Sequence, residues 1–233
     1  MKLKAALVLT GLLATTLFAS AQALPPPQNV LQLQATGTVE VQQDLLLVNL
    51  TTSREGTDAN AVQQQLRTAL DAALAEARRT AQPGQLDVRT GNFGLYPRQG
   101  RDGKLTGWTG SAELVLEGRD FARITQAAAR IQTMTYGGIS FGLSREQRAK
   151  VESDAQAQAI ERFKAKAAEL AKNFGFAGYT LREVAVNAND QGFAPRQRMM
   201  TMEAKGGAAD AAVPVEAGKT SVMVTVSGTV QLK

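Results

Sequence analysis

GGISFGLS, residues 137–144, fits two different folds, and the choice between them decides how the rest of the chain is interpreted. Gly138 to Gly142 match the pattern G-x-S-x-G, which in serine hydrolases places the nucleophile on a sharp turn between a strand and a helix. The same residues also alternate, with Ser140 between Ile139 and Phe141, as a half-buried β-strand does. The first interpretation requires a base for the Ser140 hydroxyl.

The composition offers no such base. The chain has 233 residues and contains neither histidine nor cysteine. A serine hydroxyl is a weak nucleophile until a base removes its proton, and in hydrolases with this motif the base is a histidine. No serine is followed three residues later by a lysine, the alternative base. We therefore interpret Ser140 as a strand residue and expect no catalytic residue and no cofactor. The lack of cysteine also excludes thiol catalysis, disulfides and Cys/His zinc sites.

The first residues have the pattern of a secretory signal peptide. Lys2 and Lys4 precede an apolar run over residues 5–18, which is short for a membrane span. Small residues then allow cleavage after Ala21 or Ala23. We therefore expect a periplasmic or secreted protein.

Four segments are predicted along the chain. They are a signal peptide over residues 1–23, a proline-rich leader over 24–29, a single domain over 30–233, and within it a mobile loop over 188–218 that is rich in Ala, Gly and Pro. The 26 basic residues of the whole chain, less the two in the signal, leave 24 against 21 acidic ones. A balance this close to neutral, with no basic strip, argues against nucleic acid as a partner.

Hydrophobic periods predict the elements of the domain. Helical periods of three and four begin after Thr57, Asp120 and Ser144, which we expect to be the N-caps, and Gly175 ends the third helix. A bulge is expected at Gly37. Strand patterns cover residues 30–41, 44–53, 86–96, 105–118, 139–143, 179–187 and 220–232.

The order of the elements from residue 44 to residue 143 is strand, helix, strand, strand, helix, strand. This is the ferredoxin-like βαββαβ order, an antiparallel sheet with two helices on one face. We predict an α+β fold with this core, a long C-terminal helix and a closing strand pair. The first strand is expected to pair with the last strand or with the core. The stripe expected to be buried on the long helix is Ile160, Phe163, Ala167, Leu170 and Phe174.

Several short motifs then occur in a fixed order. VQQD (41–44) has the valine and aspartate of a Val-x-Pro-Asp turn without its proline. NFGLYP (92–97) follows, then Thr-Gly-Trp (106–108), where tyrosine is the usual aromatic, and GISFGLS (138–144). An Ala/Lys-rich helix, an Ala/Met/Pro-rich loop and an alternating last strand complete the series. In this order and over nearly the whole mature chain, it resembles the SIMPL-domain family of exported bacterial proteins, which includes periplasmic immunogenic proteins.

The resemblance implies a strand at residues 138–144 and no catalytic serine. It also implies a non-enzymatic envelope protein associated with oxidative or envelope stress, since members of this family have that character and some form ring-like or channel-like homo-oligomers. We therefore expect a self-assembling envelope component that forms homo-oligomers through open sheet edges, because an unpaired strand edge is sticky. Peripheral association with the outer membrane is a further expectation.

A methionine cluster in the 188–218 loop offers an alternative function. Met199, Met200 and Met202 carry thioethers, which bind copper(I) and are oxidised reversibly to sulfoxides. The cluster is the best metal-site candidate in the sequence, and it predicts a copper(I)-handling or oxidant-handling periplasmic protein. The simpler interpretation is a loop in which methionine provides adaptable contacts.

Overall fold

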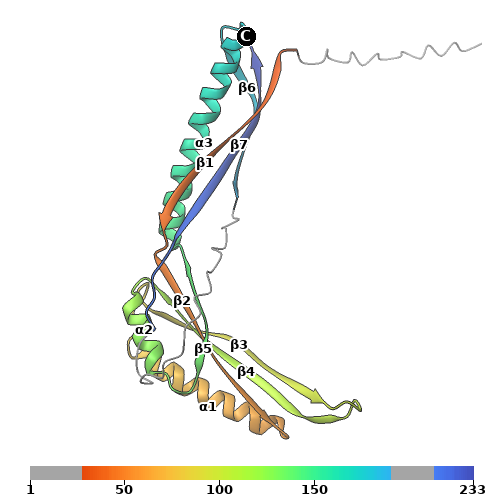
Figure 1. Ribbon diagram of the computed structural model, residues 1–233, viewed down its shortest axis with the longest axis vertical. Coiled ribbons are helices and arrows are strands. Elements are labelled where there is room, and N and C mark those ends of the chain that lie inside the picture. The colour runs from red at the N-terminus through yellow and green to blue at the C-terminus, as the bar shows by residue number, and fades with distance from the viewer. Residues whose placement is uncertain (1–27, 190–212) are drawn as a thin grey trace, which may run out of the picture.

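The computed structural model describes residues 28–189 and 213–233. Its elements form two groups arranged end to end, one around α3 and the other around α1 and α2 (Figure 1). The predicted α+β class is confirmed. The elements are β1 (Val30–Gln42), β2 (Leu45–Gly56), α1 (Ala59–Arg78), β3 (Asp87–Gln99), β4 (Leu105–Gly118), α2 (Phe121–Arg130), β5 (Thr135–Gly142), α3 (Arg145–Asn173), β6 (Tyr179–Asn189) and β7 (Lys219–Leu232).

The ferredoxin-like core is a four-stranded sheet with the order β3-β4-β2-β5, in which all neighbours are antiparallel. Helices α1 and α2 cover one face of this sheet (Figure 1). Alternate residues of β2, Leu46, Val48 and Leu50, are fully buried under these helices, as expected for a strand with one face on a core. The predicted βαββαβ arrangement is therefore confirmed for β2 to β5.

The remaining strands form a second sheet with the order β1-β7-β6. The first and last strands pair with each other along their whole length, from Val30 with Gln231 to Gln42 with Lys219. Helix α3 packs on one face of this sheet, and Phe163 is buried there against Val226 and Val230. The long helix and the closing strand pair β6–β7 therefore build a core of their own and do not extend the ferredoxin-like sheet.

Helix α3 approaches β1 closely because small residues meet there. A Cβ atom on Gly37 would lie 1.9 Å from the backbone oxygen of Ala155 and 2.7 Å from the nitrogen of Ala159. The β1–β7 register runs past Gly37 without a shift, so the bulge predicted at this residue is wrong. The glycine is needed for contact with the helix. The buried stripe of α3 accordingly consists mostly of alanine. Its residues are Val151, Ala155, Ala159, Phe163, Ala167 and Ala171.

Two details of the helix predictions also need correction. The N-cap of α1 is Asp58 and not Thr57, because its carboxylate accepts a hydrogen bond from Ala61 N at 2.7 Å. Phe174 is 61% exposed and does not belong to the buried stripe, since it is the C-cap residue that follows the last turn of α3. Gly175 ends the helix as predicted, with a φ of 81° and a hydrogen bond from Phe176 N to Ala171 O.

Within the described residues, three segments pass between the two groups of elements: β1–β2, β5–α3 and the residues just before β7 (Figure 1). Backbone hydrogen bonds join these crossings, from Gln43 N to Gly218 O at 3.0 Å and from Asp44 N to Gly142 O at 3.1 Å. The buried Gln43 side chain also donates to Phe141 O. Hydrogen bonds therefore join the three segments at residues 43–44, 141–142 and 218, and we call this junction the waist. Within the described residues, no helix is both long and apolar enough to cross a membrane.

Candidate functional site

Ser140 lies inside β5, paired with Leu47 of β2, and its side chain is exposed. Ile139 and Phe141 on either side of it pack on the core. A nucleophile elbow would place the serine on a strained turn at the helix start. Here the helix start is Ser144, and among the described residues only Asn29 is a non-glycine residue with positive φ. No described side chain hydrogen-bonds to Ser140, so the geometry matches the strand interpretation.

The methionine candidates Met199, Met200 and Met202 lie outside the described residues. The same holds for the signal peptide and for most of the predicted mobile loop. In the described part of the chain, no group of three or more acidic side chains is placed to hold a metal ion. The copper(I) interpretation thus stays a prediction from the sequence.

The sheet edges are the next candidates, and β1 is the best protected of them. Two cationic side chains of α3 reach this strand, with Arg162 Nη1 donating to Thr36 O at 2.7 Å and Lys166 Nζ donating to Gln34 O at 3.3 Å. A strand added along β1 would have to displace both. Charged side chains on an edge are a common protection against unwanted strand pairing.

The two edge strands of the ferredoxin-like sheet are also poorly suited to pairing with an added strand. Strand β3 contains Pro97, which has no N–H to donate, and its pairing with β4 shifts register twice. Strand β5 has only eight residues, includes Gly137 and Gly138, and shifts register against β2. Short, irregular or proline-containing edges discourage further pairing.

Strand β6 differs from the other three edges. It has eleven residues, and after a register shift between Leu181 and Glu183 the segment 184–188 contains no charge, glycine or proline. Leu181, Val184 and Val186 are 55%, 44% and 44% exposed. We call these three residues the β6 apolar strip. Among the described residues, the strand thus combines an unpaired edge with exposed apolar side chains.

The strip is exposed because α3 is narrower than the sheet it covers. Pairing places Leu181 opposite Val230 and Val186 opposite Val226, so the strip shares a sheet face with two buried valines. The core under α3 is built from β1 and β7, and of β6 only Tyr179, at its start, packs against it. From there on, β6 extends beyond the cover of the helix.

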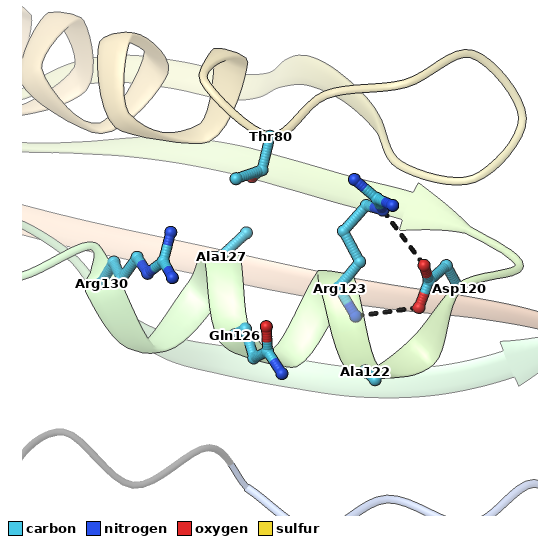
Figure 2. Close-up of a pocket in the computed structure, with 7 residues that line it drawn as sticks. All are labelled: Thr80, Asp120, Ala122, Arg123, Gln126, Ala127 and Arg130. Atoms are coloured by element: carbon cyan, nitrogen blue, oxygen red, sulfur yellow. Dashed lines mark hydrogen bonds and ion pairs between the residues drawn. The ribbon is translucent and has the colours of Figure 1, made fainter.

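A separate polar pocket of about 250 Å³ lies between α2 and the end of α1. Figure 2 shows Arg123 and Arg130 rising from α2 on the side of the segment that carries Thr80, with Ala127 between them. The remaining lining residues are Asp120, Ala122 and Gln126. We call this the α2 pocket. The two arginines are seven residues apart, which puts them on one face of the helix, about 10 Å apart along its axis.

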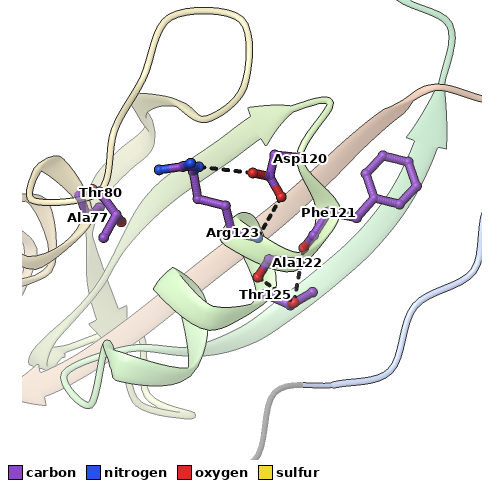
Figure 3. A network of polar contacts seen from close by, with 7 residues as sticks. All are labelled: Ala77, Thr80, Asp120, Phe121, Ala122, Arg123 and Thr125. Carbon is purple, nitrogen blue, oxygen red and sulfur yellow. Dashed lines mark hydrogen bonds and ion pairs between the residues drawn. The ribbon is translucent and has the colours of Figure 1, made fainter.

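Hydrogen bonds fix one side of the α2 pocket. Asp120 is the N-cap of α2, and its carboxylate accepts from the backbone N and from Nε of Arg123, both at 3.0 Å (Figure 3). These hydrogen bonds from Arg123, the backbone one first, hold the pKa of Asp120 below its ordinary value of 3.8. Thr125 Oγ1 donates back to Phe121 O at 3.0 Å and holds the same turn. The Arg123 guanidinium is therefore oriented by its own helix.

A second, wider pocket of about 670 Å³ runs along α1 beside Thr133. Its polar lining comes from uncharged amides and hydroxyls and from Arg54, whose Nη1 already donates to Thr52 and Ser53. No carboxylate lines it. The described lining of this pocket therefore contains no acid–base pair.

The comparison with protein families decides the identity of the fold. The family model of SIMPL, described as "Protein of unknown function (DUF541)", matches residues 31–230. The chain belongs to the SIMPL family. The match extends over both sheets and α3, as the motif series predicts, and the family resemblance is confirmed. No curated protein gives a significant match.

Solved structures add nothing to this assignment. Two matching structures are described as "The crystal structure of AtUAH in complex with glyoxylate" and "The crystal structure of AtUAH in complex with (S)-hydroxyglycine". Each is 13% identical to this chain with a TM-score of 0.24, and covers 55% of it. The chain spans about a third of their length, 34%. Similarity at this level carries no argument about fold or activity.

Proposed function

We propose that this SIMPL protein is a non-enzymatic component of the bacterial envelope that acts by self-association through β6. The observation that supports it is the combination of the β6 edge, which pairs with no other strand among the described residues, with the β6 apolar strip. The signal-peptide pattern of residues 1–23 supports export to the periplasm or secretion. A protective role in oxidative or envelope stress, and peripheral contact with the outer membrane, complete the proposal and rest on the family resemblance.

Strand addition would satisfy both properties of β6. A second copy placed along the edge supplies partners for the unpaired N–H and C=O groups and covers the apolar side chains. Burying a Leu or Val side chain fully contributes about 1.5–3 kcal/mol relative to leaving it exposed. The side chains of the strip are about half exposed, so association would add about half of this per residue. Covering these three residues and pairing the edge N–H and C=O groups both contribute free energy to association.

The test compares two leucines of equal exposure. Leu181 in β6 is 55% exposed and Leu105, at the start of β4, is 57% exposed. Light scattering on the purified wild type at micromolar concentration should give a mass several times that of the 24.8 kDa chain. Leu181→Lys should reduce this mass toward the monomer because it places a charge in the interface. Leu105→Lys should not.

Two results would contradict the proposal. One is a monomeric wild type across the concentration range. The other is an oligomer that survives both Leu181→Lys and the double variant Leu181→Lys/Val186→Lys, since association would then use another surface. Circular dichroism of each variant separates loss of assembly from loss of fold.

A further inference from the structure

We propose that the α2 pocket is a binding site for a phosphate group, held between Arg123 and Arg130. This site is distinct from the β6 edge, on the other sheet, and does not depend on self-association. The pocket combines a cavity of about 250 Å³ with two guanidinium groups that rise to the same side of α2 (Figure 2).

The donors of the pocket are available to a ligand. Asp120 occupies Nε of Arg123, which leaves the Nη groups of that guanidinium free of this carboxylate. Within the described residues, the exposed side chain of Arg130 makes no hydrogen bond or ion pair. Gln126 is exposed and adds an amide donor. The Thr80 hydroxyl already donates to Ala77 O at 3.4 Å and is not counted among the free donors. The free donors of the pocket therefore come from the side chains of α2.

The charge balance favours an anion. Two arginines and one aspartate give the lining a formal charge of +1, and the aspartate is already bonded to Arg123. Hydrogen bonds from Arg123 keep the pKa of Asp120 low, so its carboxylate stays ionised and keeps the guanidinium in place. A ligand with oxygen acceptors and negative charge can meet the free ends of both arginines. A cation would meet two like charges.

The size and geometry favour a phosphate group over larger anions. Sites for drug-sized ligands are about 300–1,000 Å³, and this pocket is smaller. A guanidinium fork matches the oxygens of phosphate, and a tetrahedral group can accept from two such forks on opposite sides. The phosphate could be free or could belong to a lipid headgroup, and the recognition chemistry is the same in both cases.

The test measures binding of inorganic phosphate to the purified protein by titration calorimetry at low ionic strength, where ion pairing is least screened. A second arm measures cosedimentation with phosphatidylcholine vesicles that contain phosphatidylglycerol. Arg130→Gln is the test variant, because Arg130 supports no other described contact. Arg101→Gln, in the exposed turn between β3 and β4, removes the same charge elsewhere. Thermal unfolding checks that both variants are folded.

We expect Arg130→Gln to weaken phosphate binding roughly tenfold, the equivalent of one charge-assisted hydrogen bond, and Arg101→Gln to leave it unchanged. Vesicle binding without binding of free phosphate, if lost in Arg130→Gln alone, supports the same site with a lipid as the source. The proposal is overturned if neither probe binds at millimolar phosphate. It is also overturned if both variants weaken binding equally, because the effect would then reflect net charge and not the pocket.

Discussion

Asp44 accepts two hydrogen bonds from Ser144, a residue one hundred positions later: Oδ1 from the backbone N at 2.7 Å and Oδ2 from Oγ at 2.6 Å. Ser144 Oγ in turn accepts from Gln147 N at 3.2 Å as the N-cap of α3. In a capping box, the side chain at the third helical position would bond to the N–H of the cap. Asp44 does so instead, and thereby ties the β1–β2 crossing to the start of the long helix.

This pair gives the first prediction. Asp44→Ala should lower the free energy of unfolding by about 2 kcal/mol, because it leaves the largely buried Ser144 without a partner for its N–H and hydroxyl. Ser144→Ala should cost about 1 kcal/mol through the lost cap. Urea unfolding of the two single variants and the double variant measures their coupling. A coupling energy near zero would mean that the two residues stabilise the waist independently.

Gly37 gives the second prediction. Gly37→Ala should destabilise the protein by about 1–3 kcal/mol, since the new Cβ would overlap the backbone of α3 at Ala155. Gly138→Ala is the matched control in β5, where a Cβ meets nothing within 4 Å. There the change should be neutral or slightly stabilising, because alanine restricts the unfolded chain. Thermal unfolding compares the two, and equal losses would disprove the close-contact explanation.

The hydrophobic pattern was sufficient to predict the elements and the ferredoxin-like order, because both depend on local period and on short connections. It could not predict that β1, β6 and β7 form a sheet of their own, since a period shows which face of a strand is buried and not which strand lies beside it. The exposure of Phe174 was missed for a related reason: it continues the helical period, but the helix has already ended there and Phe174 is its C-cap.

The candidate sites were harder to predict than the fold. The alternation of β6 is typical of a half-buried strand, and nothing local shows that α3 covers only β1 and β7. The α2 pocket joins Thr80 to residues some forty positions later, so no motif could show it. The seven-residue spacing of Arg123 and Arg130 was the one available signal, and such spacing is common on exposed helices. The Asp44–Ser144 contact joins the VQQD motif (41–44) to the GISFGLS motif (138–144). This contact explains structurally why an aspartate ends the first motif and a serine ends the second.

Asp120 gives a prediction about pH. Its pKa is lowered in the folded protein, so the stability that its carboxylate contributes is fully present above 3.8 and is lost as the pH falls through the lower folded value. Asp120→Asn keeps an N-cap but cannot titrate. The stability difference between wild type and this variant should be constant near neutral pH and should shrink below pH 3.8. A difference that grows in acid would show that the pKa is raised.

The methionine cluster gives a prediction from the sequence alone. If Met199, Met200 and Met202 form a copper(I) site, changing all three to leucine should abolish copper(I) binding measured by competition with a chromogenic chelator. Leucine keeps the apolar character and removes the sulfur. Changing Met223 in β7 to leucine is the control, since it removes a single thioether in a different part of the chain. A wild type that binds no copper(I), or a triple variant that still binds it, removes this function.

Ser140 gives the last prediction, because it is the one residue whose motif suggests an enzyme. A fluorophosphonate probe should not label the folded protein, since no described side chain hydrogen-bonds to this hydroxyl and the chain contains no histidine. Ser140→Ala should change stability by less than about 0.5 kcal/mol, as expected for an exposed strand position without a partner. A serine hydrolase labelled in parallel confirms the probe. Labelling that disappears in Ser140→Ala would show that a base reaches the hydroxyl from residues outside the described part of the chain, and that the G-x-S-x-G pattern is more than a strand.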